Sequence, residues 1–158
     1  MRRIAIVALA SILAIGAVFV LRITDYNRRS RVIDDLLQSH IDANVPPDSL
    51  FGQFIRRDLA KYFQLSPDSD LTVQFDLLRR GPTQVGISYP KFYLSVRITR
   101  RRQLLKEGYA RVAAVNREGF DVTDFIPRAA VLADSAVLAG IFPESVRAEI
   151  MTRIRGST

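Results

Sequence analysis

The sequence predicts an α+β protein in which a single N-terminal transmembrane helix is followed by amphipathic helices packed on a four-stranded antiparallel meander, with further helices at the C-terminus. Three observations indicate this fold. Residues 4–21 form an unbroken run of apolar and small side chains. Between residues 26 and 63, apolar side chains recur every three or four positions, which is the spacing of a helix face. From residue 71 to residue 126 they occur mainly at alternate positions, which is the pattern of a strand.

The apolar run has the length of a membrane span. Residues 4–21 would form about 27 Å of α-helix, close to the roughly 30 Å hydrocarbon core of a bilayer. The expected membrane-spanning residues include Ile4, Leu13, Gly16 and Leu21. A cleaved secretory signal would also begin with basic and then apolar residues, but here more apolar sequence follows the small residues Ala14 and Gly16. We therefore expect an uncleaved anchor.

The composition and the position of the basic residues indicate the expected source of the protein and its orientation in the membrane. All but three of the 23 basic residues are arginines, and alanine is abundant, a bias typical of GC-rich bacterial genomes. A short basic N-terminus usually stays in the cytoplasm, so we expect an inner-membrane protein with a periplasmic domain. The arginines that follow the span argue for the opposite orientation. The absence of cysteine excludes disulfides, thiolate metal sites and cysteine nucleophiles.

Three parts are expected along the chain. Residues 1–23 form the anchor, residues 24–47 a juxtamembrane helix with a Pro-Pro linker, and residues 48–158 one globular α+β domain. Pro46 and Pro47 end the juxtamembrane helix near residue 43, because proline disfavours helical geometry in the residue before it. Asp48 or Ser49 is expected to cap the next helix. Its apolar face comprises Phe51, Phe54, Ile55, Leu59, Tyr62 and Phe63.

Four strands are expected in sequence. They cover residues 71–77, 84–99, 109–117 and 120–126. Pro90 should mark a bulge or an edge in the second strand, because proline cannot donate to a sheet. A longer connection is expected over residues 100–108, and a hairpin turn over residues 116–119 with Gly119 in a left-handed conformation.

Helical patterns return after Pro127. Asp134 or Ser135 can cap a short helix, and another helix begins at Pro143. The helices before and after the sheet are expected to cover one of its faces. This order of elements resembles the cystatin-like and nuclear-transport-factor-like folds, in which amphipathic helices lie on a curved antiparallel sheet. The resemblance covers architecture alone.

No residue set predicts catalysis or a cofactor. His40 is the only histidine and has no sequence neighbour positioned to work with it, so a structural role is expected. The acidic loop of residues 66–70 fails the spacing of a calcium site and is interpreted as a turn. A catalytic pocket between sheet and helices would have to use Tyr89, Tyr93, Tyr109 or Asp76. Aromatic residues at these spacings more often fill a core.

Arginine clusters are the remaining candidate site. One cluster, Arg28, Arg29 and Arg31, follows the predicted span, where anionic lipid headgroups are within reach. A second, Arg100, Arg101 and Arg102, lies at a strand end and could bind an acidic protein. Nucleic-acid binding would also use the net charge of +7, but no motif accompanies that charge.

The expected function is that of a single-pass membrane protein without catalytic activity. It would act as an accessory, scaffold or assembly subunit of a bacterial membrane complex and would bind membrane protein partners through its α+β domain. Homo-oligomers are compatible with this function, and no cofactor, metal or nucleic acid is expected. The alternative is a membrane-tethered domain that binds a small ligand or acts as an enzyme, with a pocket between sheet and helices.

Overall fold

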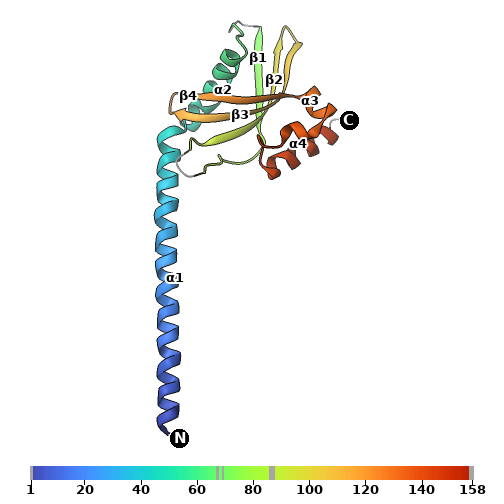
Figure 1. The fold of residues 1–158 in the computed structure, drawn as a ribbon. Helices are drawn as coiled ribbons and strands as arrows, with labels where there is room; N and C mark the ends of the chain where they lie inside the picture. Colours follow the sequence, from blue (N-terminus) through green and yellow to red (C-terminus); the bar gives the residue numbers. More distant parts are fainter. Residues whose placement is uncertain (1, 67, 69, 86–87, 157–158) are drawn as a thin grey trace. The chain divides into compact units, whose positions relative to one another are not determined.

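The computed structural model describes the backbone of residues 2–66, 68, 70–85 and 88–156, and the side chains of these residues apart from 2–18 and 21. The elements in chain order (Figure 1) are α1 (Arg2–Asn44), α2 (Asp48–Tyr62), β1 (Leu71–Leu77), β2 (Lys91–Arg100), β3 (Gln103–Asn116), β4 (Gly119–Pro127), α3 (Arg128–Ala133), the 3₁₀ helix η1 (Ser135–Leu138) and α4 (Glu144–Gly156). The chain divides into two compact units, Met1–Ser39 and His40–Thr158.

The first helix, α1, is continuous from Arg2 to Asn44. It contains the predicted juxtamembrane helix, which is therefore joined to the preceding segment without a break. The predicted membrane-spanning residues Ile4, Leu13, Gly16 and Leu21 lie outside the residues whose side chains are described. Within the described part of the chain, no helix has a stretch both long and apolar enough for a membrane span.

The four strands form one antiparallel sheet in the order β1-β2-β3-β4. Each strand pairs with the next along the chain, as shown by Phe75 opposite Val96 and by Tyr109 opposite both Ser95 and Ile126. The predicted meander and the α+β class are thus confirmed.

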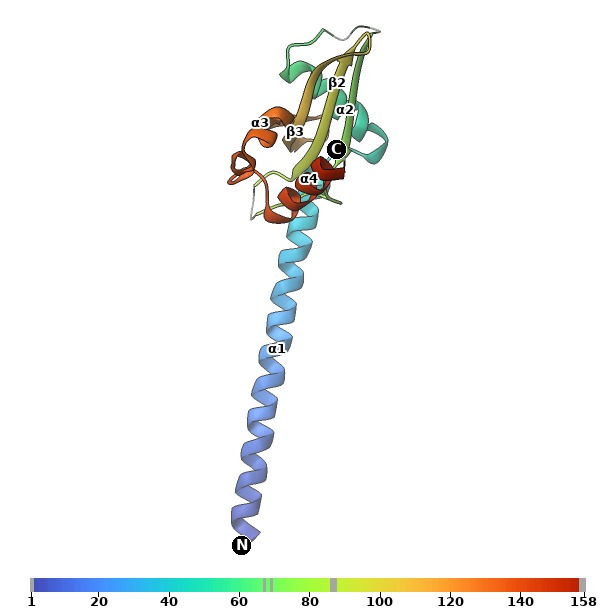
Figure 2. The same cartoon turned by 90° about the vertical axis from the view of Figure 1, so that its right-hand side faces the viewer.

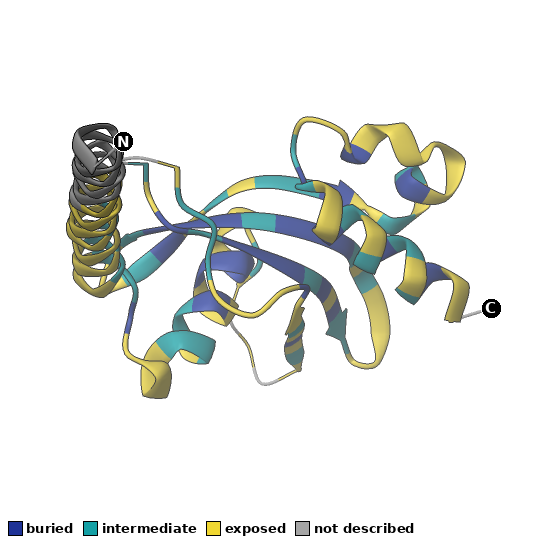
Figure 3. Ribbon diagram, turned by 90° about the horizontal axis from the view of Figure 1, so that it is seen from below, coloured by how far each residue is buried: buried dark blue, intermediate teal, exposed yellow. Residues whose placement is uncertain are grey.

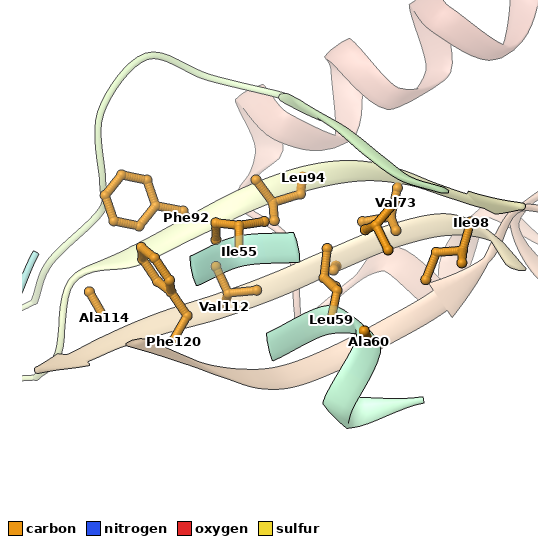
Figure 4. Packing of buried hydrophobic residues seen from close by; sticks show 12 residues of the cluster. Ile55, Leu59, Ala60, Val73, Phe92, Leu94, Ile98, Val112, Ala114 and Phe120 are labelled. Carbon is orange, nitrogen blue, oxygen red and sulfur yellow. The ribbon is translucent and has the colours of Figure 1, made fainter. Parts of the chain in front are cut away.

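Both faces of the sheet are covered, so the prediction that the helices share one face is wrong. On the first face, Ile55 and Leu59 of α2 pack in a core with Leu94 and Val112 (Figure 4). On the second face, residues of the C-terminal helices pack in a core with Tyr93 and Tyr109. Figure 2 shows α4 in front of the sheet. Buried residues consequently run along the middle of the central strands (Figure 3). The reason lies in β2 and β3, because Tyr93 and Tyr109 place aromatic rings on the face opposite Leu94 and Val112, so both faces need cover.

The turn between β2 and β3 is tighter than predicted. Only Arg101 and Arg102 separate the two strands, and both adopt positive φ angles, 51° and 67°. This is the backbone of a two-residue hairpin turn, which glycine or asparagine usually occupies. The connection predicted over residues 100–108 is therefore wrong, and β3 begins instead at Gln103. The second strand is shorter than predicted, because it begins at Lys91 directly after Pro90.

Helix caps agree with the sequence only in part. The N-cap of α2 is Pro47, and neither Asp48 nor Ser49 forms the predicted cap. Asp134 does cap η1, since its Oδ1 accepts a 2.8 Å hydrogen bond from the backbone N–H of Ala136. A proline with fixed φ can begin a helix unaided, because the first N–H groups of a helix can bond to water.

A buried carboxylate joins α2 to the start of β4. Asp58 is 9% exposed, and its Oδ2 accepts a 2.8 Å hydrogen bond from the backbone N–H of Phe120. Arg57 donates to both Asp58 oxygens and, at 2.6 Å, to the carbonyl of Glu118. The hydrogen bond to Asp58 raises the pKa of Arg57. Gly119 does not adopt the predicted left-handed conformation, and a Cβ there would lie 2.6 Å from Nη2 of Arg57, so the guanidinium group would have to shift.

Replacing Asp58 with alanine should lower the free energy of unfolding by about 2–3 kcal/mol, because it leaves the buried N–H of Phe120 without its acceptor. Urea unfolding followed by circular dichroism measures the change. The exposed Asp76 of β1 is the control, and Asp76→Ala should alter stability by less than about 0.5 kcal/mol. Equal losses in the two variants would show that Asp58 does not hold α2 to the sheet.

Candidate functional site

The sheet has a step where β4 ends. Gly108 of β3 pairs with Pro127, the last residue of β4, while β3 itself extends back to Gln103. Residues 103–107 are exposed or half-buried and pair with β2 along one edge. Within the described chain no strand lies along their other edge. An edge of this kind can accept an extended segment of another protein.

An apolar hollow lies beside this step. It has a volume of about 440 Å³. Its apolar lining comprises Phe63, Leu104, Leu105, Phe125, Pro127 and Ala129. Leu104 is 46% exposed, so a large aliphatic group is already available to a partner. The charged residues Lys106, Glu107 and Arg128 complete the lining, and the ammonium group of Lys106 lies 5.6 Å from the ring centre of Phe63.

A polar hollow adjoins the apolar one and shares Glu107 and Arg128 with it. It has a volume of about 380 Å³ and lies between the sheet and α4. Its other lining residues are Ser95, Gly108, Tyr109, Arg153 and Gly156. The two hollows together form what we call the step site: an apolar recess next to a recess lined with guanidinium and hydroxyl groups.

The charges around the polar hollow leave a positive excess. Glu107 is shared by two arginines, with contacts of 3.7 Å to Arg97 and 4.0 Å to Arg128. Arg153 donates a 2.7 Å hydrogen bond to Glu149. Among the lining residues, the two arginines outnumber the single carboxylate of Glu107, which gives a formal charge of +1. The long Glu107 contacts leave both of its arginines within reach of an added carboxylate or phosphate.

The surroundings of the polar hollow also change the pKa of the Tyr109 hydroxyl group. Burial raises its pKa above the ordinary value near 10, and the charge and hydrogen bond of Arg128 oppose that rise. Tyr109 therefore keeps its proton at neutral pH and can donate a hydrogen bond. It is not a base.

Replacing Arg128 with alanine should raise the pKa of Tyr109 further, because the opposing charge is lost. The unfolded tyrosine ionises near pH 10 while the folded one still holds its proton, so stability should fall as the pH rises above about 10. Ultraviolet titration of tyrosine ionisation, with Tyr109→Phe to identify the group, measures the shift. A lower pKa for Tyr109 in Arg128→Ala would contradict the assigned role of Arg128.

Of the four residues considered for a catalytic pocket, only Tyr109 lines a hollow of the step site. Tyr93 is buried, and its hydroxyl forms a 2.9 Å hydrogen bond with Thr83. The ring centres of Tyr89 and His40 lie 6.3 Å apart, and Asp76 is exposed on β1. The four side chains therefore do not form one site.

The structure places the imidazole of His40 beside Gln84. It is half-buried, and its Nδ1 lies 2.8 Å from Nε2 of Gln84, within hydrogen-bond distance. Elsewhere in the described part of the chain, no group of three His, Asp or Glu side chains is placed to hold a metal ion.

The predicted arginine clusters are partly paired. Arg100 lies 3.3 Å from Asp68, and Arg101 donates a 2.9 Å hydrogen bond to Asp70. These pairs join Asp68 and Asp70, before β1, to the β2–β3 turn, while residues 67 and 69 of the predicted turn lie outside the described residues. In α1, Arg29 pairs with Asp25 at 3.0 Å.

A larger hollow, of about 770 Å³, lies between α2 and the start of β4. Its lining includes Arg57 and Asp58, whose polar groups already bond to one another and to β4. The polar groups of Arg57 and Asp58 therefore serve the fold. The step site instead offers a strand edge that pairs with no described strand and a carboxylate, Glu107, that makes long contacts with Arg97 and Arg128.

Sequence reasoning missed Arg128 and Arg153. They lie 25 positions apart, and only the packing of α3 and α4 on the second face of the sheet brings them to one hollow. Comparison of the chain with protein-family models, curated proteins and solved structures gives no match.

Proposed function

We propose that this protein is a single-pass, membrane-anchored subunit of a bacterial membrane complex, and that its α+β domain binds a partner protein without catalysing a reaction. The observation that carries the proposal is the apolar run of residues 4–21, which stands at the start of a helix continuous to Asn44. A run of this length and composition has the properties of a membrane span.

The step site supports partner binding. An extended segment beside residues 103–107 could bond to the strand edge while an apolar side chain enters the hollow at Leu104. Arg128 and Arg153 favour an acidic group on that partner. Apolar contact surrounded by charge is the usual composition of a protein interface.

The proposed location is the inner membrane, with the domain in the periplasm. The exposed Arg28 and Arg31 follow the anchor and would contact anionic headgroups. Each charge near such a surface contributes on the order of 1 kcal/mol.

Membrane fractionation tests the anchor. After an alkaline carbonate wash, the full-length protein should remain in the membrane pellet, whereas residues 40–158 expressed alone should not. Protease added to spheroplasts should digest the domain if it is periplasmic and leave it intact if it is cytoplasmic. Release of the full-length protein by carbonate would refute the anchor.

A small-ligand-binding domain is the second candidate, and the polar hollow favours it. Ser95 and Tyr109 add hydroxyl groups to its two arginines. Saturable binding of inorganic phosphate, lost in Arg153→Ala, would support this function over partner binding.

A further inference from the structure

The part of α1 that follows the apolar run exposes large apolar side chains. Ile23 is 45% exposed, Tyr26 73% and Ile33 56%. These residues belong to the unit Met1–Ser39, separate from the compact domain. A helix with such exposure is marginal in water unless its apolar face packs against something.

The spacing of this face is that of a coiled coil. Ile23, Tyr26, Ser30, Ile33 and Leu37 follow one another at steps of three, four, three and four residues. These are the a and d positions of a heptad repeat, which meet along the seam of paired helices. Ser30 and Leu37 are the half-buried residues among the described positions of this unit. Most other positions between residues 22 and 39 are polar or charged.

The flanking charges favour two parallel copies. Arg29 occupies a g position, and Asp34 occupies the e position five residues later. In a parallel pair the g residue of one helix contacts this e residue of the other, so Arg29 would meet Asp34 twice, once on each side. An antiparallel pair would instead bring g residues opposite g residues, and the like charges would repel.

Arg29 can make this contact although it already pairs with Asp25 of its own helix. In the single chain it pairs with Asp25, but its side chain is 77% exposed and that of Asp25 59%. An exposed pair of this kind contributes little, so Arg29 can lie between Asp25 of its own helix and Asp34 of a second copy. Arg28 and Arg31 occupy f and b positions, away from the seam, and remain available to lipid headgroups.

We propose that residues 22–38 of α1 form a parallel coiled coil with a second copy of this chain. The parallel orientation rests also on the proposed anchor, because two copies inserted in one membrane have the same direction. Confinement to the membrane raises their effective concentration, so a short seam with one polar a position is sufficient. The domain would then act as a pair, with two step sites.

Disulfide cross-linking of the full-length protein in native membranes tests this pairing. The chain has no cysteine, so each variant carries a single thiol. Ile33→Cys places it on the seam, and Asp35→Cys places it at an f position on the opposite side of the helix. With a mild oxidant, Ile33→Cys should give a cross-linked dimer several-fold more efficiently than Asp35→Cys. Equal efficiency, or no dimer from Ile33→Cys, would overturn the proposal.

A charge exchange tests the contact itself. Arg29→Glu in the Ile33→Cys background should reduce cross-linking several-fold, and adding Asp34→Arg should restore it. Failure of the second substitution to restore the dimer would refute the Arg29–Asp34 pairing.

Fractionation of the same samples separates this inference from the proposed function. A carbonate-resistant protein without seam-specific cross-links would retain the anchor and lose the coiled coil. Seam-specific cross-links in a protein that the carbonate wash releases would retain the coiled coil and refute the anchor.

Discussion

Replacing Gly108 with alanine is expected to cost more than about 3 kcal/mol of folding free energy. A Cβ at this position would collide with the carbonyl oxygen of Ile126, and would lie 2.7 Å from Cζ of Phe125 and 2.9 Å from Cα of Pro127. Two of these contacts are backbone atoms of β4, so the strand itself must move. Because Gly108 lies at the step where β4 ends, the step site should be lost as well.

Urea unfolding of the purified protein measures this loss. The matched control is Gly156→Ala in α4, where a Cβ would meet no atom within 4 Å. That control should change stability by less than about 0.5 kcal/mol. Similar stabilities for Gly108→Ala and Gly156→Ala would mean that β3 and β4 do not approach as closely as described.

The second large effect concerns the anchor. Replacing both Leu13 and Gly16 with arginine should release most of the protein from the membrane fraction. Each arginine near the centre of a span costs about 2.5–3.5 kcal/mol on the insertion scale, so the pair would cost roughly 5–7 kcal/mol. The ten leucine, isoleucine, valine and phenylalanine residues that remain contribute about 0.3–0.6 kcal/mol each, so at mid-range values the two arginines outweigh their combined contribution.

Immunoblotting of membrane and soluble fractions gives the readout. Leu13→Ile is the control, because it keeps the segment apolar, and it should leave the distribution unchanged. Retention of the double arginine variant in carbonate-washed membranes would show that residues 4–21 are not the anchor.

The strand pattern could be predicted because apolar alternation depends on local sequence. The first strand, residues 71–77, and the final strand near residues 120–126 were located almost to the residue. The turn between β2 and β3 could not be, because Arg101 and Arg102 adopt a conformation for which arginine has no preference. It is held in place by long-range pairs, including Arg101 with Asp70.

The step site was largely beyond sequence reasoning. It exists because β3 is longer than β4 and because both faces of the sheet carry helices, and neither fact is local. Among the residues considered for a pocket between sheet and helices, Tyr109 is the one that lines a hollow of this site. The sequence does not indicate a role for Gly108, because that role depends on how closely β4 approaches β3 in the folded protein.

Purification of the full-length protein from its own host in mild detergent tests the central claim most directly. We compare the wild type with Leu104→Asp, which places a charge in the apolar hollow, and with Val85→Asp as control. Val85 is 82% exposed and lies outside the hollows described here. The wild type and Val85→Asp should recover the same membrane partner in stoichiometric amount, and Leu104→Asp should lose it. Recovery of the wild-type protein alone, or retention of the partner by Leu104→Asp, would contradict a partner-binding function at the step site.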